Sequence, residues 1–204
     1  MAYDSLRDGE LAALVTFLEM REPPTSGIPP SALNLRRMRP PMLDDYRALF
    51  RRVGAPWLWF SRLMLDDSAL AEIIHDQKVE VFAVEDEAGC DAGILELDFR
   101  APNECELAFV GLLPELSGQG HGRWLLAEAL RLAWRDGVRR VHVHTCSLDH
   151  PAALSAYVRA GFTPYKRAIE RFPDPRLLGV LARDCAPQVP LIGTPDSVPA
   201  CPAT

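Results

Sequence analysis

Residues 112–134, LLPELSGQGHGRWLLAEALRLAW, place a glycine loop between an apolar segment and an amphipathic helix. Gly118, Gly120 and Gly122 have no Cβ, so the backbone there can pass close to a ligand. The helix that follows at once has unpaired amides and a positive dipole end, which suit a pyrophosphate. The loop lacks the Gly-Lys-Ser/Thr of a P-loop, and its mid-chain position disfavours a dinucleotide fingerprint. A plain strand-to-helix turn is the alternative.

The segments around this loop alternate between the periodicities of strands and helices. Glycine and proline residues mark the boundaries. We predict strands over 32–38, 78–85, 92–99, 104–112, 138–146 and 162–171, and helices over 41–53, 57–65, 68–75, 122–135 and 151–160. Antiparallel strands followed by a β-α-β-α-β run indicate an α/β fold with a mixed, mostly antiparallel sheet and helices on both faces.

The two ends of the chain differ from this central part. Leu11, Leu14, Val15 and Leu18 have helical spacing, which predicts an amphipathic helix over 5–21 that packs on the main domain or binds a partner. The Pro-rich stretch EPPTSGIPPS follows as a linker, and residues 186–204 contain five prolines. We expect residues 186–204 to be disordered or loosely draped. We therefore divide the chain into an N-terminal helix and linker (1–30), a main domain (31–172) and a Pro-rich C-terminal tail (173–204).

Composition narrows the function classes. The 204 residues include 22 Lys and Arg against 28 Asp and Glu, which gives a formal charge of −6. Such a chain lacks the clustered positive charge that nucleic acid or an anionic membrane requires. No apolar run reaches the roughly 18 residues of a membrane span, and acidic residues precede the N-terminal apolar stretch where an export signal would be basic. Five scattered cysteines without a CxxC pair indicate reduced thiols in the cytoplasm.

A second segment decides between a plain turn and a ligand loop. Residues 138–162, VRRVHVHTCSLDHPAALSAYVRAGF, predict a strand, a short loop and a helix that ends at Gly161-Phe162. Together with the glycine loop, this order and spacing resemble the GNAT superfamily of acetyl-CoA-dependent N-acetyltransferases over residues 32–170. The phrase HTCSLDHPAAL (144–154) and the upstream VGAPWLWFSR (53–62) are similar to a bacterial subgroup of that family.

The resemblance implies an acetyl-CoA site between two splayed strands, those near 104–112 and 138–146. The pantetheine arm would lie against the backbone of Val110, Gly111 and Leu112. The pyrophosphate would be held by amides of the loop, at Gly118, Gln119, Gly120, His121, Gly122 and Arg123. Ser117 replaces the family's usual Arg or Gln, and His150 occupies the place of an Asn that contacts the cofactor arm in many members.

The resemblance also implies the catalytic groups. Tyr157 matches the family's general acid, although Leu154 and Val158 beside it also suit a core tyrosine. An alkyl amine has a pKa of about 10, so it must lose a proton before it attacks the thioester. Glu104 and Glu106, two apart on one strand face, are the candidate bases, with solvated surface charges as the alternative. His144 is a lesser candidate. No metal is expected, although His142, His144 and Cys146 form an H-x-H-x-C pattern.

We expect an N-acetyltransferase that acts on a primary amine of a small molecule. Trp57, Trp59 and Phe60 lie where this family walls the acceptor site, and core packing is the equal alternative. A protein lysine or N-terminal acetyltransferase is the alternative among enzymes. A non-catalytic acyl-CoA-binding module, with the N-terminal helix and the tail as partner elements, is the alternative outside enzymes. The sequence leaves the acceptor and the oligomeric state open, including a homodimer.

Overall fold

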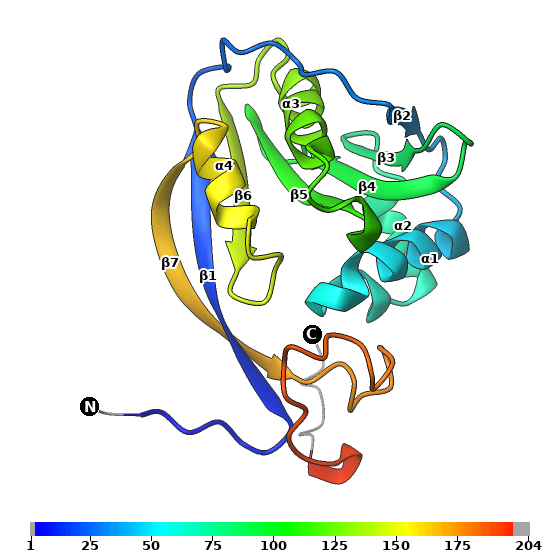
Figure 1. The fold of residues 1–204 in the computed structure, drawn as a ribbon, viewed down its shortest axis with the longest axis vertical. Helices are drawn as coiled ribbons and strands as arrows, with labels where there is room; N and C mark the ends of the chain where they lie inside the picture. Colours follow the sequence, from blue (N-terminus) through cyan, green and yellow to red (C-terminus); the bar gives the residue numbers. More distant parts are fainter. Residues whose placement is uncertain (1–2, 198–204) are drawn as a thin grey trace.

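In the computed structural model, which describes residues 3–197, seven strands form one open sheet in the order β2-β3-β4-β5-β6-β1-β7 (Figure 1). All neighbouring strands are antiparallel except β5 and β6, which are parallel. The mixed, mostly antiparallel sheet is thus confirmed. The strands are β1 (Glu10–Met20), β2 (Asn34–Arg37), β3 (Val79–Glu85), β4 (Asp91–Asp98), β5 (Glu104–Leu112), β6 (Arg140–Cys146) and β7 (Thr163–Pro173).

The parallel pair separates along its length. β5 and β6 are paired only at their first residues, down to Glu106 opposite His142. Beyond this point the rest of each strand has no partner on the side that faces the other, and a register shift between β4 and β5 falls at the same place, opposite Glu96 and Leu97. The predicted splay is therefore present, and it divides the sheet into a β2–β5 half and a β6–β1–β7 half (Figure 1).

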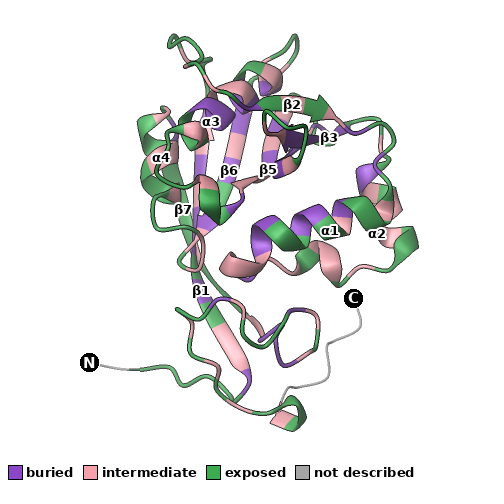
Figure 2. Ribbon diagram, turned by 45° about the vertical axis from the view of Figure 1, so that its right-hand side comes forward, coloured by how far each residue is buried: buried purple, intermediate pink, exposed green. Residues whose placement is uncertain are grey.

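Helices cover both faces, as expected. The helices α1 (Leu43–Gly54) and α2 (Asp67–Ile74) pack on β3 and β4, and α1 buries the predicted stripe of Tyr46, Leu49, Phe50 and Val53 (Figure 2). The helix α3 (His121–Ala133) covers the other face through Trp124, Leu125, Ala129 and Leu130, and α4 (Ala153–Arg159) lies beside β6 on that side. Residues 57–65 are not one helix. Leu58 adopts a left-handed backbone (φ 56°) between two single 3-10 turns, Ala55–Trp57 and Ser61–Leu63, so the segment turns back on itself.

The predicted N-terminal helix is wrong, because residues 10–20 form β1 in the sheet. β1 is antiparallel to both of its neighbours, β6 and β7. The helical spacing of the apolar residues does not correspond to a buried face, because Leu14 is 49% exposed whereas Ala13 is 1% exposed. A bulge between Phe17 and Leu18 shifts the register, so the buried residues follow no single period. The first segment of the chain thus belongs to the central sheet.

The C-terminal segment packs on the rest of the protein before and at the start of the stretch 186–204, which was expected to be disordered or loosely draped. Leu177, Leu181 and Ala186 are buried, and Leu181 and Ala186 pack around Leu58. Arg176 and Asp174 form a buried ion pair at 2.7 Å, and Arg176 also donates to the carbonyl of Val189. This segment therefore supports the loop after α1. Residues 198–204, with Cys201, lie outside the described part of the chain.

Candidate active site

A cavity of about 1450 Å³ follows the splay between β5 and β6. Its walls come from both halves of the sheet, from the glycine loop, from α4 and from the loop after α1. Most of the predicted site residues meet there: Val110, Gly111, Leu112, Gly118, Gly120, Gly122, Arg123, His150, Trp57, Trp59, Phe60, Glu106 and Tyr157. The structure therefore brings most of the expected cofactor, catalytic and acceptor residues to one place.

The glycine loop has the geometry of a ligand cradle. Gly118 and Gly120 have positive φ angles of 79° and 85°, and no atom lies within 4 Å of a Cβ built on Gly118, Gly120 or Gly122. The first-turn amides of α3 are therefore not covered by side chains at these positions. Gln119 and His121 do not line the cavity: Gln119 donates to the carbonyl of Glu115 at 3.0 Å, and His121 is hydrogen-bonded to Ser31 at 2.9 Å.

The end of β5 presents backbone to the cavity. Val110, Gly111 and Leu112 lie beyond the last β5–β6 pair, so their side of the strand is available to an extended ligand arm. A side chain at Gly111 would meet Val53 at 2.6 Å and Trp59 at 3.0 Å. Gly111 thus allows α1 and Trp59 to pack directly on the strand. The binding of a pantetheine arm at this edge stays a prediction.

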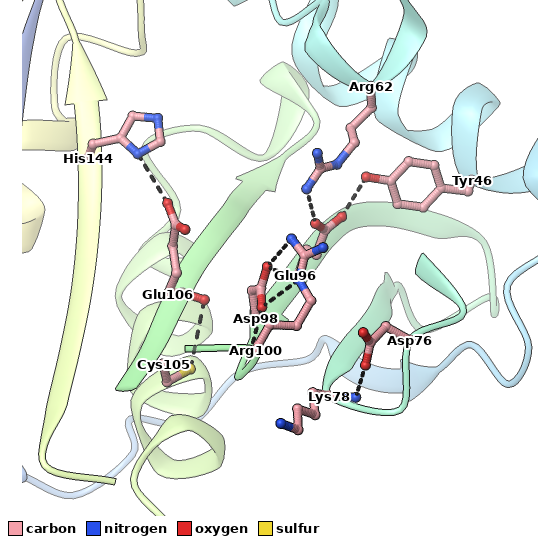
Figure 3. A network of polar contacts seen from close by, with 10 residues as sticks. All are labelled: Tyr46, Arg62, Asp76, Lys78, Glu96, Asp98, Arg100, Cys105, Glu106 and His144. Atoms are coloured by element: carbon pink, nitrogen blue, oxygen red, sulfur yellow. Dashed lines mark hydrogen bonds and ion pairs between the residues drawn. The ribbon is translucent and has the colours of Figure 1, made fainter. Parts of the chain in front are cut away.

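Glu106 and His144 face each other across the start of the splay. His144 Nδ1 lies 3.3 Å from Glu106 Oε1 (Figure 3). The hydrogen bond with His144 lowers the pKa of Glu106, and the same hydrogen bond raises the pKa of His144. The Glu106 carboxylate therefore stays ionised at neutral pH, and the imidazole of His144 is hydrogen-bonded to it.

Glu104 does not belong to this group. Its carboxylate accepts from Arg140 at 2.8 Å and lines a smaller cavity of about 480 Å³ with His142 and Arg100. Arg140 also binds Glu19 of β1 at 2.7 Å, so Glu104 takes part in an ion-pair network. Of the two candidate bases, Glu106 alone lines the main cavity.

Tyr157 lies on α4 and lines the main cavity, and its ring meets Phe162 edge-on at a centroid distance of 5.8 Å. Burial raises the pKa of Tyr157, and the nearby negative charge of Asp149 acts in the same direction. The hydroxyl therefore stays protonated at neutral pH and is available as a donor.

Asp149, which the sequence analysis did not assign, joins the two sides of the splay. Its carboxylate accepts from Trp59 Nε1 at 2.9 Å, from the Thr145 hydroxyl at 2.7 Å and from the Cys146 amide at 2.8 Å. Next to it, His150 contacts Trp57 edge-on at 5.0 Å. The aromatic segment 57–60 is thus attached to the end of β6. A lone Asp in a loop carries no periodic signal, and its Trp59 partner is 90 residues away in the chain.

A buried ion pair that the sequence analysis also did not assign lies close to the aromatic segment. Glu96 is 0% exposed, and its carboxylate accepts from Arg62 at 2.6 Å and from the Tyr46 hydroxyl at 2.5 Å (Figure 3). The Arg62 guanidinium lies 5.2 Å from the centre of the Phe109 ring and lines the main cavity. This pair fixes the 3-10 turn Ser61–Leu63 against β4 and β5.

Within residues 3–197, no cluster of three or more His, Cys, Asp or Glu side chains could hold a metal ion. Burial raises the pKa of the Cys146 thiol to about 11, which makes it a poor nucleophile at neutral pH. None of the described helices combines the length and the apolar character that crossing a membrane requires.

Solved structures share this fold. A GCN5-related N-acetyltransferase from Sphaerobacter thermophilus is 20% identical (TM-score 0.56, 82% of this chain and 52% of that one). One from Kribbella flavida is 19% identical (TM-score 0.53, 82% and 60%). A dodecameric spermidine N-acetyltransferase from Vibrio cholerae is 18% identical (TM-score 0.51, 75% and 98%). The chain thus spans only 52% and 60% of the length of the first two.

Sequence comparison gives the family. No protein of curated function matches the chain significantly. The sequence model described as the acetyltransferase (GNAT) family matches residues 41–162, which include α1, the glycine loop, Glu106 and Tyr157. Since this match covers more than half of the chain, the protein belongs to the acetyltransferase (GNAT) family.

Proposed function

We propose that the protein transfers an acetyl group from acetyl-CoA to a primary amine of a small molecule. The observation that carries this proposal is the position of Glu106, paired with His144, and of Tyr157 around one cavity at the splay. The same cavity begins at the open glycine loop. A base, an acid and a cradle for a phosphorylated cofactor are the parts that acyl transfer to an amine needs.

This chain's residues would hold acetyl-CoA along the cavity. The amides of Gly118, Gly120 and Gly122, which line the cavity, bind the pyrophosphate, aided by the helix dipole of α3, whereas the Arg123 amide donates to the carbonyl of Gly120 at 3.1 Å. The free edge of Val110, Gly111 and Leu112 makes strand-like hydrogen bonds to the pantetheine arm. His150 lines the cavity near Trp57, but its Nδ1 accepts from the amide of Ala152 at 3.1 Å, so only its other ring nitrogen is available to the arm.

The reaction forms an N–C bond and breaks a C–S bond. Glu106 accepts a proton from the ammonium group of the acceptor, directly or through water, so that the neutral amine can attack the thioester carbonyl. Tyr157 donates its proton to the departing thiolate and regains one from the nitrogen, which loses its second proton as the amide forms. The ionised state of Glu106 and the protonated state of Tyr157 at neutral pH follow from the directions of their pKa shifts.

The acceptor end of the cavity favours a cationic molecule with an apolar part. Trp57, Trp59 and Phe60 line it, and Phe60 contacts Phe172 at a centroid distance of 5.0 Å. Aromatic faces attract cations. Glu170 of β7 adds a carboxylate to the same cavity.

The four described cysteines are free, which supports a cytoplasmic location for the enzyme.

The test is thiol release from acetyl-CoA across a panel of amines. The panel contains aliphatic diamines, aromatic amines, amino acids and lysine peptides. We expect turnover with at least one small amine, and loss of turnover in Glu106→Gln. Glu104→Gln is the matched control, because Glu104 lies outside the main cavity. Turnover of peptides alone would favour a protein acetyltransferase, and CoA binding without turnover of any amine would favour a binding module.

A further inference from the structure

The linker between β1 and β2 connects the two halves of the sheet. β1 lies beside β6 in one half of the sheet, whereas β2 is the outer strand of the other half. Residues 21–33 must therefore pass from one half to the other, and they do so as one extended segment that is neither helix nor β-strand (Figure 1). We call residues 23–31 of this linker the strap.

The strap is attached to the glycine loop. The Ser31 hydroxyl is hydrogen-bonded to His121 Nδ1 at 2.9 Å and also accepts from the amide of Leu33 at 3.1 Å. His121 is the first residue of α3, so this contact fixes the end of the strap at the cradle. Five strap residues line the main cavity together with the loop glycines: Pro24, Ser26, Gly27, Pro29 and Pro30.

The part of the cavity next to the strap combines uncharged and positively charged residues. Residues 23–31 carry no charge and contain four prolines. On the other walls, Arg123 and Arg159 line the cavity, and neither forms an ion pair with any residue between 3 and 197. A cavity lined by uncharged proline surface and by two guanidinium groups without ion-pair partners among the described residues suits a ligand with a flat apolar ring and phosphate groups.

We propose that the strap forms the outer wall of the site for the nucleotide end of CoA. The adenine ring packs on the prolines, and Arg123 and Arg159 face the phosphates. This proposal rests on the proposed use of acetyl-CoA, because the strap encloses the end of the cofactor that lies farthest from the thioester. Substitutions in the strap should therefore not change the reaction rate with an acetyl donor that lacks the nucleotide.

Gly27 offers a clean test. No atom lies within 4 Å of a Cβ built there, and Gly27 is not among the residues of positive φ, so substitution costs little folding energy. Gly27→Glu adds a negative charge and Gly27→Arg a positive one. The exposed Ala88 in the β3–β4 turn, outside the cavity lining, takes the same substitutions as a matched control for net charge. Calorimetric titration measures the Kd of CoA, and kcat/KM is measured with acetyl-CoA and with uncharged acetyl-pantetheine.

We expect Gly27→Glu to weaken CoA binding roughly fivefold and Gly27→Arg to strengthen it, since two charges about 4 Å apart in water interact by about 1 kcal/mol. The difference should shrink in about 1 M salt. The Ala88 pair and the rates with acetyl-pantetheine should stay unchanged. If wild type binds CoA but the Gly27 pair does not change its Kd, the strap proposal is wrong and the proposed function stands. Failure of wild type to bind CoA overturns both.

Discussion

Replacing Asp149 by Ala should both destabilise the fold and loosen the cofactor site. The substitution removes the carboxylate that accepts three hydrogen bonds, from Trp59, from the Thr145 hydroxyl and from the Cys146 amide. Thr145 is 4% exposed, so its hydroxyl would lose its partner in a place that water does not reach. Trp59 would also lose its attachment to the end of β6.

The magnitude follows from these contacts. A hydrogen bond to a charged group contributes about 1.5–3 kcal/mol, and an unsatisfied buried group costs about 1–3 kcal/mol. The three bonds share one carboxylate and do not add independently. We expect Asp149→Ala to lower the free energy of unfolding by about 3 kcal/mol. Asp149→Asn keeps an acceptor oxygen and the shape, and should lose less than half of this.

Urea unfolding followed by circular dichroism measures the change, with CoA titration as the functional readout. Thr145→Val is the matched control, because it removes one of the three donors and leaves the attachment of Trp59. We expect CoA affinity to fall in Asp149→Ala and to hold in Thr145→Val. A loss of stability below about 0.5 kcal/mol in Asp149→Ala, the range of an ordinary surface substitution, would refute this reasoning.

Three further predictions concern the buried pair, the base and the loop. Arg62→Met should destabilise by about 3–5 kcal/mol because it leaves Glu96 buried and charged, and Arg62→Met with Glu96→Met should recover part of that loss in the same urea assay. Glu106→Gln should lose rate most near pH 7 and less near pH 9, where more of the acceptor is already neutral; a pH-independent ratio to wild type near unity would remove Glu106 as the base. Gly120→Glu should abolish the thermal shift that CoA gives wild type, roughly 2.7 kcal/mol at a hundredfold excess over Kd, whereas Gly120→Asn, which tolerates the left-handed backbone, should keep most of it.

Elements with strong local signals could be predicted from the sequence. The stripe of α1 is helical and buried because its period is that of a helix packed on one side. The glycine loop and the splay also followed, since both depend on local chain geometry and on a specific family resemblance. The cavity brings together most of the residues named from that resemblance.

The errors arose where long-range pairing decides the structure. β1 lies between the last two strands, and burial at its centre with a bulge removes the alternation that would identify a strand. The order of the chain gives no indication that the first strand is inserted there. The described part of the tail is ordered because Leu58, far away in the sequence, provides a surface for it. The roles of Asp149 and Arg62 likewise depend on partners that lie distant in the chain.

The central claim is that acyl transfer occurs at the splay with Tyr157 as the acid. Its most direct test is the steady-state rate of Tyr157→Phe with acetyl-CoA and the acceptor found in the amine panel. This substitution removes only the hydroxyl and keeps the contact of the ring with Phe162. We predict that kcat falls by about 10²–10⁴-fold while KM for acetyl-CoA changes little. A kcat within about twofold of wild type would contradict the claim and assign Tyr157 to the core alone.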